Sequence, residues 1–354
     1  MGSTSQQYQA AKQIFGKIDG KRASKLVSII LPIILFFVSL LIGRYPVSPD
    51  IVFLTLLSKI LPIKYYHNIP RQIEIAILYI RLPRAIAAVL IGSTLALSGA
   101  SFQALFRNPL VSSQILGVAS GAGFGAALAL LLSDDLLLVH LSAFGFGILA
   151  VLLSYAVSKA YKETPVLTLV LAGMVVGALF SALTSLIKYV ADPYDRLPSI
   201  VFWLMGGLSG ISFKEIILSF IPIIVPCMIL LMIRWRLNVL SLGEEEAEAL
   251  GVDVNKMRIL VIGCCTLMTS AAVSIAGVIG WIGLVIPHVG RMLVGPDHKT
   301  LIPVSLSIGA SFLLVVDCVA KMISTAEIPL GILTSLIGAP FFFFLLRRGF
   351  LGWR

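Results

Sequence analysis

Long apolar stretches alternate with short polar segments along almost the whole chain. An α-helix needs about 20 apolar residues to cross the hydrocarbon core of a bilayer, and stretches near this length recur ten times. The predicted spans cover residues 26–43, 82–106, 112–132, 137–158, 166–188, 214–233, 258–276, 278–293, 301–321 and 329–346. A backbone inside lipid must satisfy its own polar groups, so each span is expected to be helical. The pattern therefore predicts an all-α, polytopic membrane protein of about ten transmembrane helices.

The segments outside the spans complete the predicted organisation. Residues 1–25 form a basic N-terminal tail, 26–348 one transmembrane domain and 349–354 a short C-terminal end. Residues 199–210 are apolar but too short to cross a bilayer, so we expect a re-entrant or interfacial helix there. An even number of spans places both termini on one side, and the distribution of Lys and Arg favours the cytoplasmic side of the plasma (inner) membrane.

Composition narrows the function classes. The chain is 58% hydrophobic and only 12% charged, whereas a soluble domain has roughly 25% charged residues. The net charge of +10 is typical of cytoplasmic loops in a membrane protein, so no nucleic-acid partner is expected. Inside the spans, Asp317 with Lys321 four residues later is the main ionisable pair. Ion-coupled carriers usually need intramembrane carboxylates or histidines, so this scarcity argues against a secondary transporter.

Motifs for catalysis or cofactor binding are not found in the sequence. Gly16-Lys17 and Gly20-Lys21 lack the Ser or Thr and the upstream glycine of a P-loop, so ATP is not expected to bind by that route. No Ser-His-Asp or metal-ligand spacing occurs. Cys264 and Cys265 are neighbours in an apolar span and point apart on a helix, so they are interpreted as buried thiols. We therefore expect neither an enzyme nor a bound cofactor or metal.

The densest run of charge lies in residues 241–256, here called the coupling loop. Ser241 and Glu244 have the spacing of a capping box, and carboxylates at 244–246 suit the positive end of a helix dipole. Gly251 can end this helix in a left-handed conformation, and Asp253 can cap a second helix. Two short helices joined by a tight turn are predicted. They are either a solvated connection between spans or a docking site for another protein.

Basic residues also occur on the outer side of the membrane, where the positive-inside rule predicts few of them. They are Arg44, Lys59, Lys64, Arg71, Arg81 and Arg84, in the first outer loop and the start of the second span. Either these side chains extend to lipid headgroups, or they have a function at the outer surface.

Several motifs together resemble one family. They are Arg81-Leu-Pro-Arg84, Gly99-Ala-Ser-Phe-Gln-Ala-Leu-Phe-Arg-Asn-Pro-Leu110, Leu116-Gly-Val-Ala-Ser-Gly-Ala-Gly123, Trp203-Leu-Met-Gly206, the 244–254 segment, Gly283-Leu-Val-Ile-Pro-His288 with Arg291, and Glu327-Ile-Pro-Leu-Gly331 followed by Gly338-Ala-Pro340. In this order and spacing the chain resembles the FecCD-type membrane permeases of ABC importers for iron–siderophores, haem and vitamin B12. Trp281 stands where the family pattern has Phe.

The resemblance implies partners. It implies a second permease copy in a homodimer or a similar permease in a heterodimer, two ATPase subunits that carry ATP and Mg, an extracytoplasmic binding protein and surrounding membrane lipid. It places the ATPase contact at Glu244, Glu245, Glu246, Glu248, Ala249, Leu250, Gly251 and Val252. Docking of the binding protein is implied for Arg81 and Arg84, with Lys321 at a position where some relatives have arginine.

The resemblance also implies a pathway between two subunits, lined by the fifth and tenth spans. The small and polar residues of those spans are Ser181, Thr184, Ser185, Thr334 and Ser335. A cytoplasmic gate is implied at Asn108, Pro109 and Leu110, with Thr164 and Pro165 at a second turn. The expected function is import of a bulky iron chelate or cobalamin, and the sequence does not name the ligand. A secondary transporter and a membrane scaffold are the alternatives, and a co-purifying ATPase would exclude both.

Overall fold

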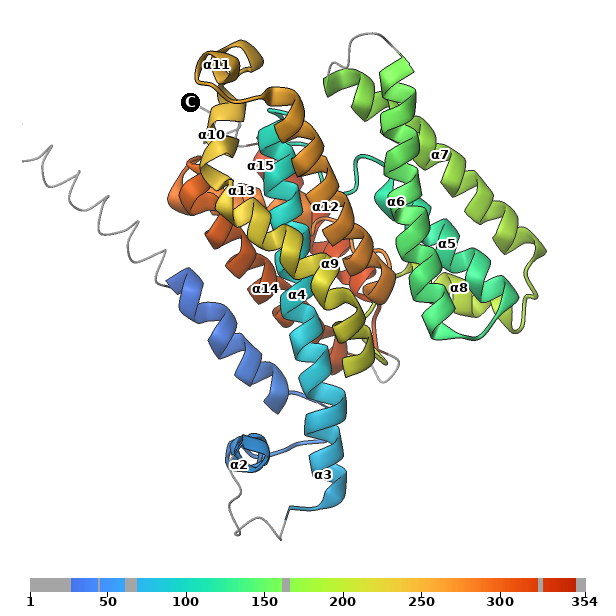
Figure 1. Ribbon diagram of the computed structural model, residues 1–354. Helices are drawn as coiled ribbons and strands as arrows, with labels where there is room; N and C mark the ends of the chain where they lie inside the picture. Colours follow the sequence, from blue (N-terminus) through green and yellow to red (C-terminus); the bar gives the residue numbers. More distant parts are fainter. Residues whose placement is uncertain (1–26, 44, 61–68, 161–165, 324–326, 348–354) are drawn as a thin grey trace, which may run out of the picture.

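Helices make up the regular structure of the chain (Figure 1). The computed structural model describes residues 27–43, 45–60, 69–160, 166–323 and 327–347, and no strand occurs in this part of the chain. After the helix Val27–Leu41 come α2 (Pro49–Ile60), α3 (Arg71–Ile75), the π-helix η1 (Ala76–Arg81), α4 (Leu82–Leu105), α5 (Val118–Leu132), α6 (Leu136–Ala160), α7 (Val166–Val190), α8 (Arg196–Leu204), α9 (Phe213–Met232), α10 (Arg234–Leu242), α11 (Glu244–Ala249), α12 (Val254–Ala276), α13 (Ile282–Val294), α14 (His298–Ile323) and α15 (Leu330–Arg347).

The predicted spans correspond to apolar helices of the structure. Six described helices are long and apolar enough to cross a membrane, and four shorter apolar helices accompany them. The all-α prediction with about ten spans is therefore confirmed. The second span is longer than predicted, because α3, η1 and α4 form one continuous helix from Arg71 to Leu105. The nine-residue helix α8 overlaps the first half of the short apolar stretch predicted at 199–210.

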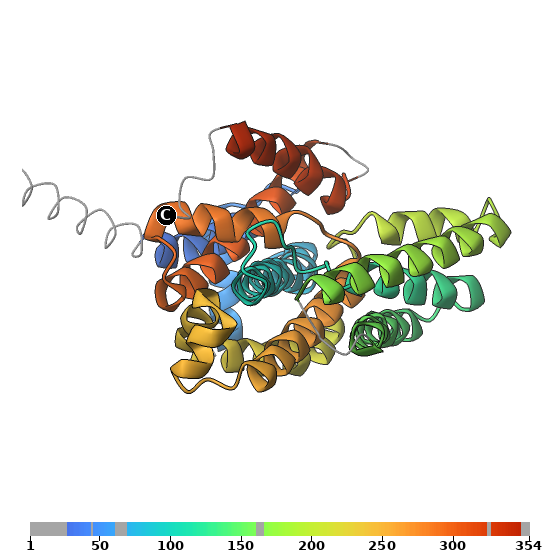
Figure 2. The ribbon, with the colours of Figure 1, turned by 90° about the horizontal axis from the view of Figure 1, so that it is seen from above.

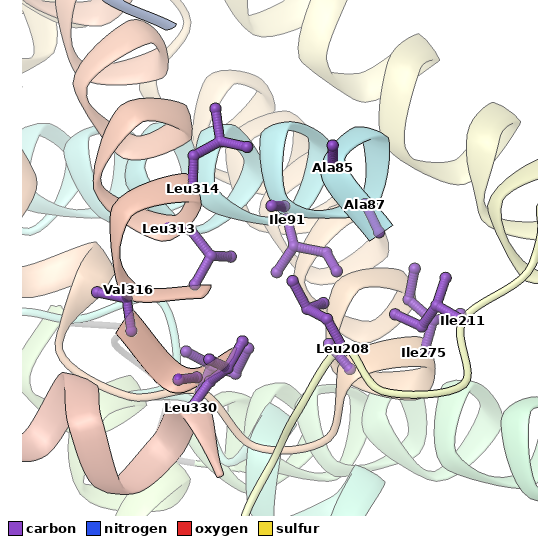
Figure 3. Packing of buried hydrophobic residues seen from close by; sticks show 14 of the residues in the cluster. Ala85, Ala87, Ile91, Leu208, Ile211, Ile275, Leu313, Leu314, Val316 and Leu330 are labelled. Atoms are coloured by element: carbon purple, nitrogen blue, oxygen red, sulfur yellow. The ribbon is translucent and has the colours of Figure 1, made fainter. Parts of the chain in front are cut away.

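Helix α4 lies at the centre of the bundle and packs against α9, α12, α13 and α14. Lipid tails are as apolar as the helices, so no hydrophobic driving force brings the helices together. They associate instead through close packing of small residues. Gly99 shows how close the packing is, because a Cβ at this position would lie 1.9 Å from the Gly283 backbone oxygen. Figure 3 shows the apolar core near the start of α4, where Ile91 faces Leu313 of α14 and Leu208 of the loop after α8.

A second group of helices stands beside this core. Helices α5, α6 and α7 pack on one another, and α8 packs against α5 (Figure 1). Phe124, Phe146 and Phe180 bring one ring each from these three spans, with centroid separations of 4.9–6.3 Å. Helix α12 contacts α5 and α6 and joins this group to the α4-centred core.

Candidate functional site

The coupling loop forms two helices, but they begin at different residues from those predicted. The capping box at Ser241 is wrong: α10 continues to Leu242, the Ser241 hydroxyl donates to the Asn238 backbone oxygen, and Gly243 precedes α11. Gly243 has φ +153°. A residue with a side chain would be strained in this conformation, and the helix α10 ends there. The other two features are confirmed. Gly251 is left-handed at φ +78°, and Asp253 caps α12 by accepting the Lys256 N–H at 3.0 Å. This hydrogen bond lowers the pKa of the Asp253 carboxyl.

One side of α11 is fixed to the bundle and the other is exposed. Ala247 and Val252 are buried among residues of α10 and α12, so Val252 anchors the loop from inside. Glu244 accepts a hydrogen bond from the nearly buried Arg258 at 2.5 Å. Glu244 therefore has a cationic partner within this chain. Glu245, Glu246, Glu248, Ala249, Leu250 and Gly251 stay exposed, and they offer an acidic surface with an apolar Leu250 to a partner.

Helix α10 is also tied to the turn between α13 and α14. Asn238 donates to the Asp297 carboxylate at 2.6 Å and accepts the His298 N–H at 2.7 Å. Burial raises the pKa of Asp297. The hydrogen bonds from Asn238 and from the Lys299 backbone N–H lower this pKa by more, so the net shift is downward. Asp297 therefore stays ionised and holds α10 against the end of the bundle.

The predicted gate occupies the connection between α4 and α5, residues 106–117, here called the gate loop. Asn108 accepts the Leu110 N–H at 2.9 Å through its own side chain, which is a turn that Asn favours. Asn108 and Leu110 are exposed and Pro109 is half-buried. Thr164 and Pro165 lie outside the described residues. The gate loop thus has an ordered turn with an exposed tip, as a gate between two subunits would require.

Gln103 connects this loop to α13, a role that the sequence analysis missed. Its side-chain amide donates to the Val111 oxygen at 3.1 Å and to the Gly283 oxygen at 3.3 Å, and its carbonyl accepts from Arg291. All of these groups are buried. The sequence did contain a signal for this contact, because Gln103 and Arg291 both lie inside apolar spans and buried polar groups need hydrogen-bond partners.

We expect Gln103→Leu to loosen the gate loop while the bundle stays folded. Leucine cannot hydrogen-bond, so buried groups lose partners at a cost of about 1–3 kcal/mol. Amide hydrogen exchange in residues 106–117 should rise roughly tenfold, because local opening free energy sets the exchange rate. Gln72→Leu, at an exposed position of α3, is the control. Unchanged exchange in the gate loop would show that Gln103 does not hold it.

The predicted pathway residues divide into two sets. Ser181, Ser185 and Ser335 are exposed on α7 and α15. Thr184 and Thr334 are buried and donate to backbone oxygens one turn earlier. The outward faces also carry large apolar side chains, such as Met174 and Leu336, which are 62% and 65% exposed. The exposed faces of α7 and α15 are therefore largely apolar, with a few hydroxyl groups among the apolar side chains.

Arg84, Asp317, Lys321 and Glu327 form an ionic group, here called the outer charge cluster, in which the Glu327 side chain is 29% exposed. Arg84 donates to Asp317 at 2.7 Å and to Glu327 at 2.8 Å, and Lys321 lies 2.5 Å from Asp317. Arg84 and Lys321 are each 7% exposed and Asp317 is fully buried. The cluster joins α4, α14 and the segment before α15.

Arg81 is also buried, and its guanidinium donates hydrogen bonds to backbone oxygens. Its guanidinium donates to Leu40, Leu41 and Tyr45 at 2.8, 3.1 and 2.5 Å, at the end of the first helix, where carbonyls lack helical partners. Contacts within the chain therefore engage Arg81, Arg84 and Lys321, the three residues for which docking of a binding protein was predicted. Their docking role stays a prediction that this geometry does not favour.

Comparison with known proteins shows the family of the chain. The family model of the FecCD transport family matches residues 30–348. The molybdate import permease MolB of Haemophilus influenzae is 44% identical over 325 residues, which cover 90% of this chain and 95% of MolB. The cobalamin import permease BtuC of Halobacterium salinarum is 40% identical over 281 residues, covering 79% of this chain and 75% of BtuC.

A solved structure extends the likeness to the fold. It is described as a metal-chelate type ABC transporter in an inward-facing conformation, and it has a TM-score of 0.81 at 41% identity. The match covers 92% of this chain and 98% of the other. The chain is a multi-pass protein of the inner membrane and is not itself an enzyme. It belongs to the FecCD transport family and is a permease subunit of an ABC importer.

Proposed function

We propose that this chain forms half of a pathway that passes a bulky iron chelate, such as a siderophore complex or haem, or cobalamin, into the cytoplasm. The observation that carries the proposal is the character of the exposed faces of α7 and α15. They combine apolar side chains with the hydroxyls of Ser181, Ser185 and Ser335. The only charged residues of the two helices are Lys188 and Arg347, near their ends. Such a wall lets a large ligand slide without binding it tightly.

The proposed assembly has two-fold symmetry. A second copy of this chain covers α7 and α15, two ATPase subunits that carry ATP and Mg bind the exposed side of α11, and an extracytoplasmic binding protein delivers the ligand. Both termini lie in the cytoplasm in this assembly. In support, α11 lies at the end of the molecule opposite to α2 and α3 (Figure 1), so a partner at the coupling loop is remote from one at the outer surface.

An oxyanion is the second candidate ligand, because the 44% identical relative is named for molybdate. A small dianion needs a counter-charge in an apolar surrounding. Between Val166 and Ile187 of α7 the sequence offers no basic residue. This favours the bulky chelate.

Uptake into proteoliposomes tests the proposal. The full chain is reconstituted with its ATPase and binding protein, and uptake of labelled ferric siderophores, haemin, cobalamin and molybdate is compared. We expect ATP-dependent uptake of a chelate or cobalamin and little uptake of molybdate. Uptake of molybdate alone would contradict the ligand class, and uptake that an ion gradient drives without ATP would contradict the mechanism.

A further inference from the structure

An apolar groove lies between α6 and α12, on the surface of two membrane spans. Its cavity volume is about 270 Å³. Four residues of α6 from Ile148 to Tyr155 line it, together with five residues of α12 from Ile259 to Leu267. At its centre is Gly263, where an added Cβ would meet no atom within 4 Å. The groove is therefore open space that a glycine helps to leave unfilled.

The position of the groove limits what can fill it. Leu152 and Ile259 are 59% and 56% exposed, so the groove opens outward from the bundle. Seen from above, α6 and α12 lie on the side of the molecule away from α15 (Figure 2), so the part of the second copy that is proposed to cover α15 is remote from the groove. Water does not fill an apolar groove, and an empty one would lose dispersion contacts. A lipid chain is the occupant that fits this surrounding.

Charge distinguishes the two ends of the groove. Residues three or four apart are neighbours on a helix surface, so Lys159 lies one turn beyond Tyr155 and Lys256 one turn before Ile259. Both lysines are exposed, and Lys256 shares its ammonium with Asp253 at 2.9 Å. Among the described residues Lys159 has no ion-pair partner. At the other end the next residues are Phe144 and Gly145 on α6 and Ser270 and Ala271 on α12, which carry no charge.

We propose that this groove binds an anionic phospholipid, with one acyl chain against Gly263 and the phosphate between Lys159 and Lys256. An ammonium group has three donors, so Lys256 can bind phosphate while it contacts Asp253. Basic residues between helices on the cytoplasmic side recognise anionic headgroups, and the proposed function places these lysines on that side. The lipid would fill the seam between the α5–α6–α7 group and α12.

Photo-crosslinking tests this site in the full chain in proteoliposomes. The probe is phosphatidylglycerol with a diazirine on its acyl chain, and phosphatidylcholine with the same chain is the comparison. We expect labelled peptides from 148–155 and 259–267, and stronger competition by unlabelled phosphatidylglycerol than by phosphatidylcholine. Lys159→Gln/Lys256→Gln should reduce this preference about fivefold to thirtyfold, from the usual effect of one or two basic groups near a membrane surface. Lys214→Gln, at the opposite end of the spans, should not change it.

A matched pair of glycine variants tests the groove itself. Gly263→Phe should fill the groove and abolish labelling. Gly145→Phe should leave labelling intact, because it is also a glycine with no atom near its added Cβ but lies outside the groove. Equal labelling by the two probes, unaffected by Gly263→Phe, would show bulk lipid only and overturn the proposal. Labelling confined to other helices would overturn it as well. Neither result bears on uptake, so this proposal can fail while the proposed function stands.

Discussion

The variant Glu245→Lys/Glu248→Lys is expected to lose ATPase binding while the permease keeps its fold. Both carboxylates are exposed on α11, and the buried contacts of Ala247 and Val252 that hold the helix are untouched. Removing one partner of a desolvated charge pair at an interface costs about 2–5 kcal/mol. Two reversals should therefore raise the dissociation constant at least about thirtyfold, measured by titration of the ATPase onto the permease in nanodiscs.

The controls separate the exposed carboxylates from the structural one. Glu74→Lys/Asp195→Lys reverses two charges outside the coupling loop and should bind the ATPase normally. Glu244→Gln weakens the contact to Arg258 and should lower thermal stability more than the double reversal does. If the ATPase binds Glu245→Lys/Glu248→Lys with unchanged affinity, the assignment of the coupling loop is wrong.

Loss of Arg84 should destabilise the folded permease through the outer charge cluster. Arg84→Met leaves the fully buried Asp317 with Lys321 alone and releases Glu327. Removing one partner of a buried ion pair costs about 3–5 kcal/mol. The remaining Lys321 should place the loss near the lower value, which reversible unfolding in a denaturing detergent would measure.

A compensated variant distinguishes a structural role from docking. Replacing a buried ionic triad by apolar residues of similar size is often neutral, so Arg84→Met/Asp317→Leu/Lys321→Met should regain most of the stability. If the cluster is structural, this triple variant binds the extracytoplasmic protein with wild-type affinity. A large loss of binding despite restored stability would support docking instead. Arg84→Met with unchanged stability would contradict the stabilising role.

The length of the apolar stretches was sufficient to predict the membrane spans. The apolar stretches are long and the polar breaks between them are clear, so the spans could be located without tertiary information. The continuous helix from Arg71 to Leu105 was cut short in the prediction, because polar residues at its outer end look like a loop. Local signals also succeeded at Gly251 and Asp253, where cap chemistry depends on a few neighbouring residues.

Contacts between distant segments could not be read from the sequence. Arg84 and Asp317 are separated by 233 positions, and Gln103 and Arg291 by 188. A basic residue in an outer segment looks the same in the sequence whether it is free or buried against another helix, and this is why the contacts of Arg81 and Arg84 within the chain were not predicted. Ser241 failed for a related reason, because Gly243 rather than a polar cap decides where α11 begins.

A cysteine in place of Asn108 tests the central claim, a two-fold permease gated at residues 106–117. The four native cysteines are first replaced by alanine, and transport by this background is verified. Asn108 is at an exposed tip, so the two copies should cross-link across the symmetry axis in an inward-closed state and separate in an inward-open one. We predict a cross-link yield that changes with nucleotide and binding protein in the reconstituted complex. No cross-link in any state, in a variant that still transports, would contradict the gate, and a single permease copy in the active complex would contradict the architecture.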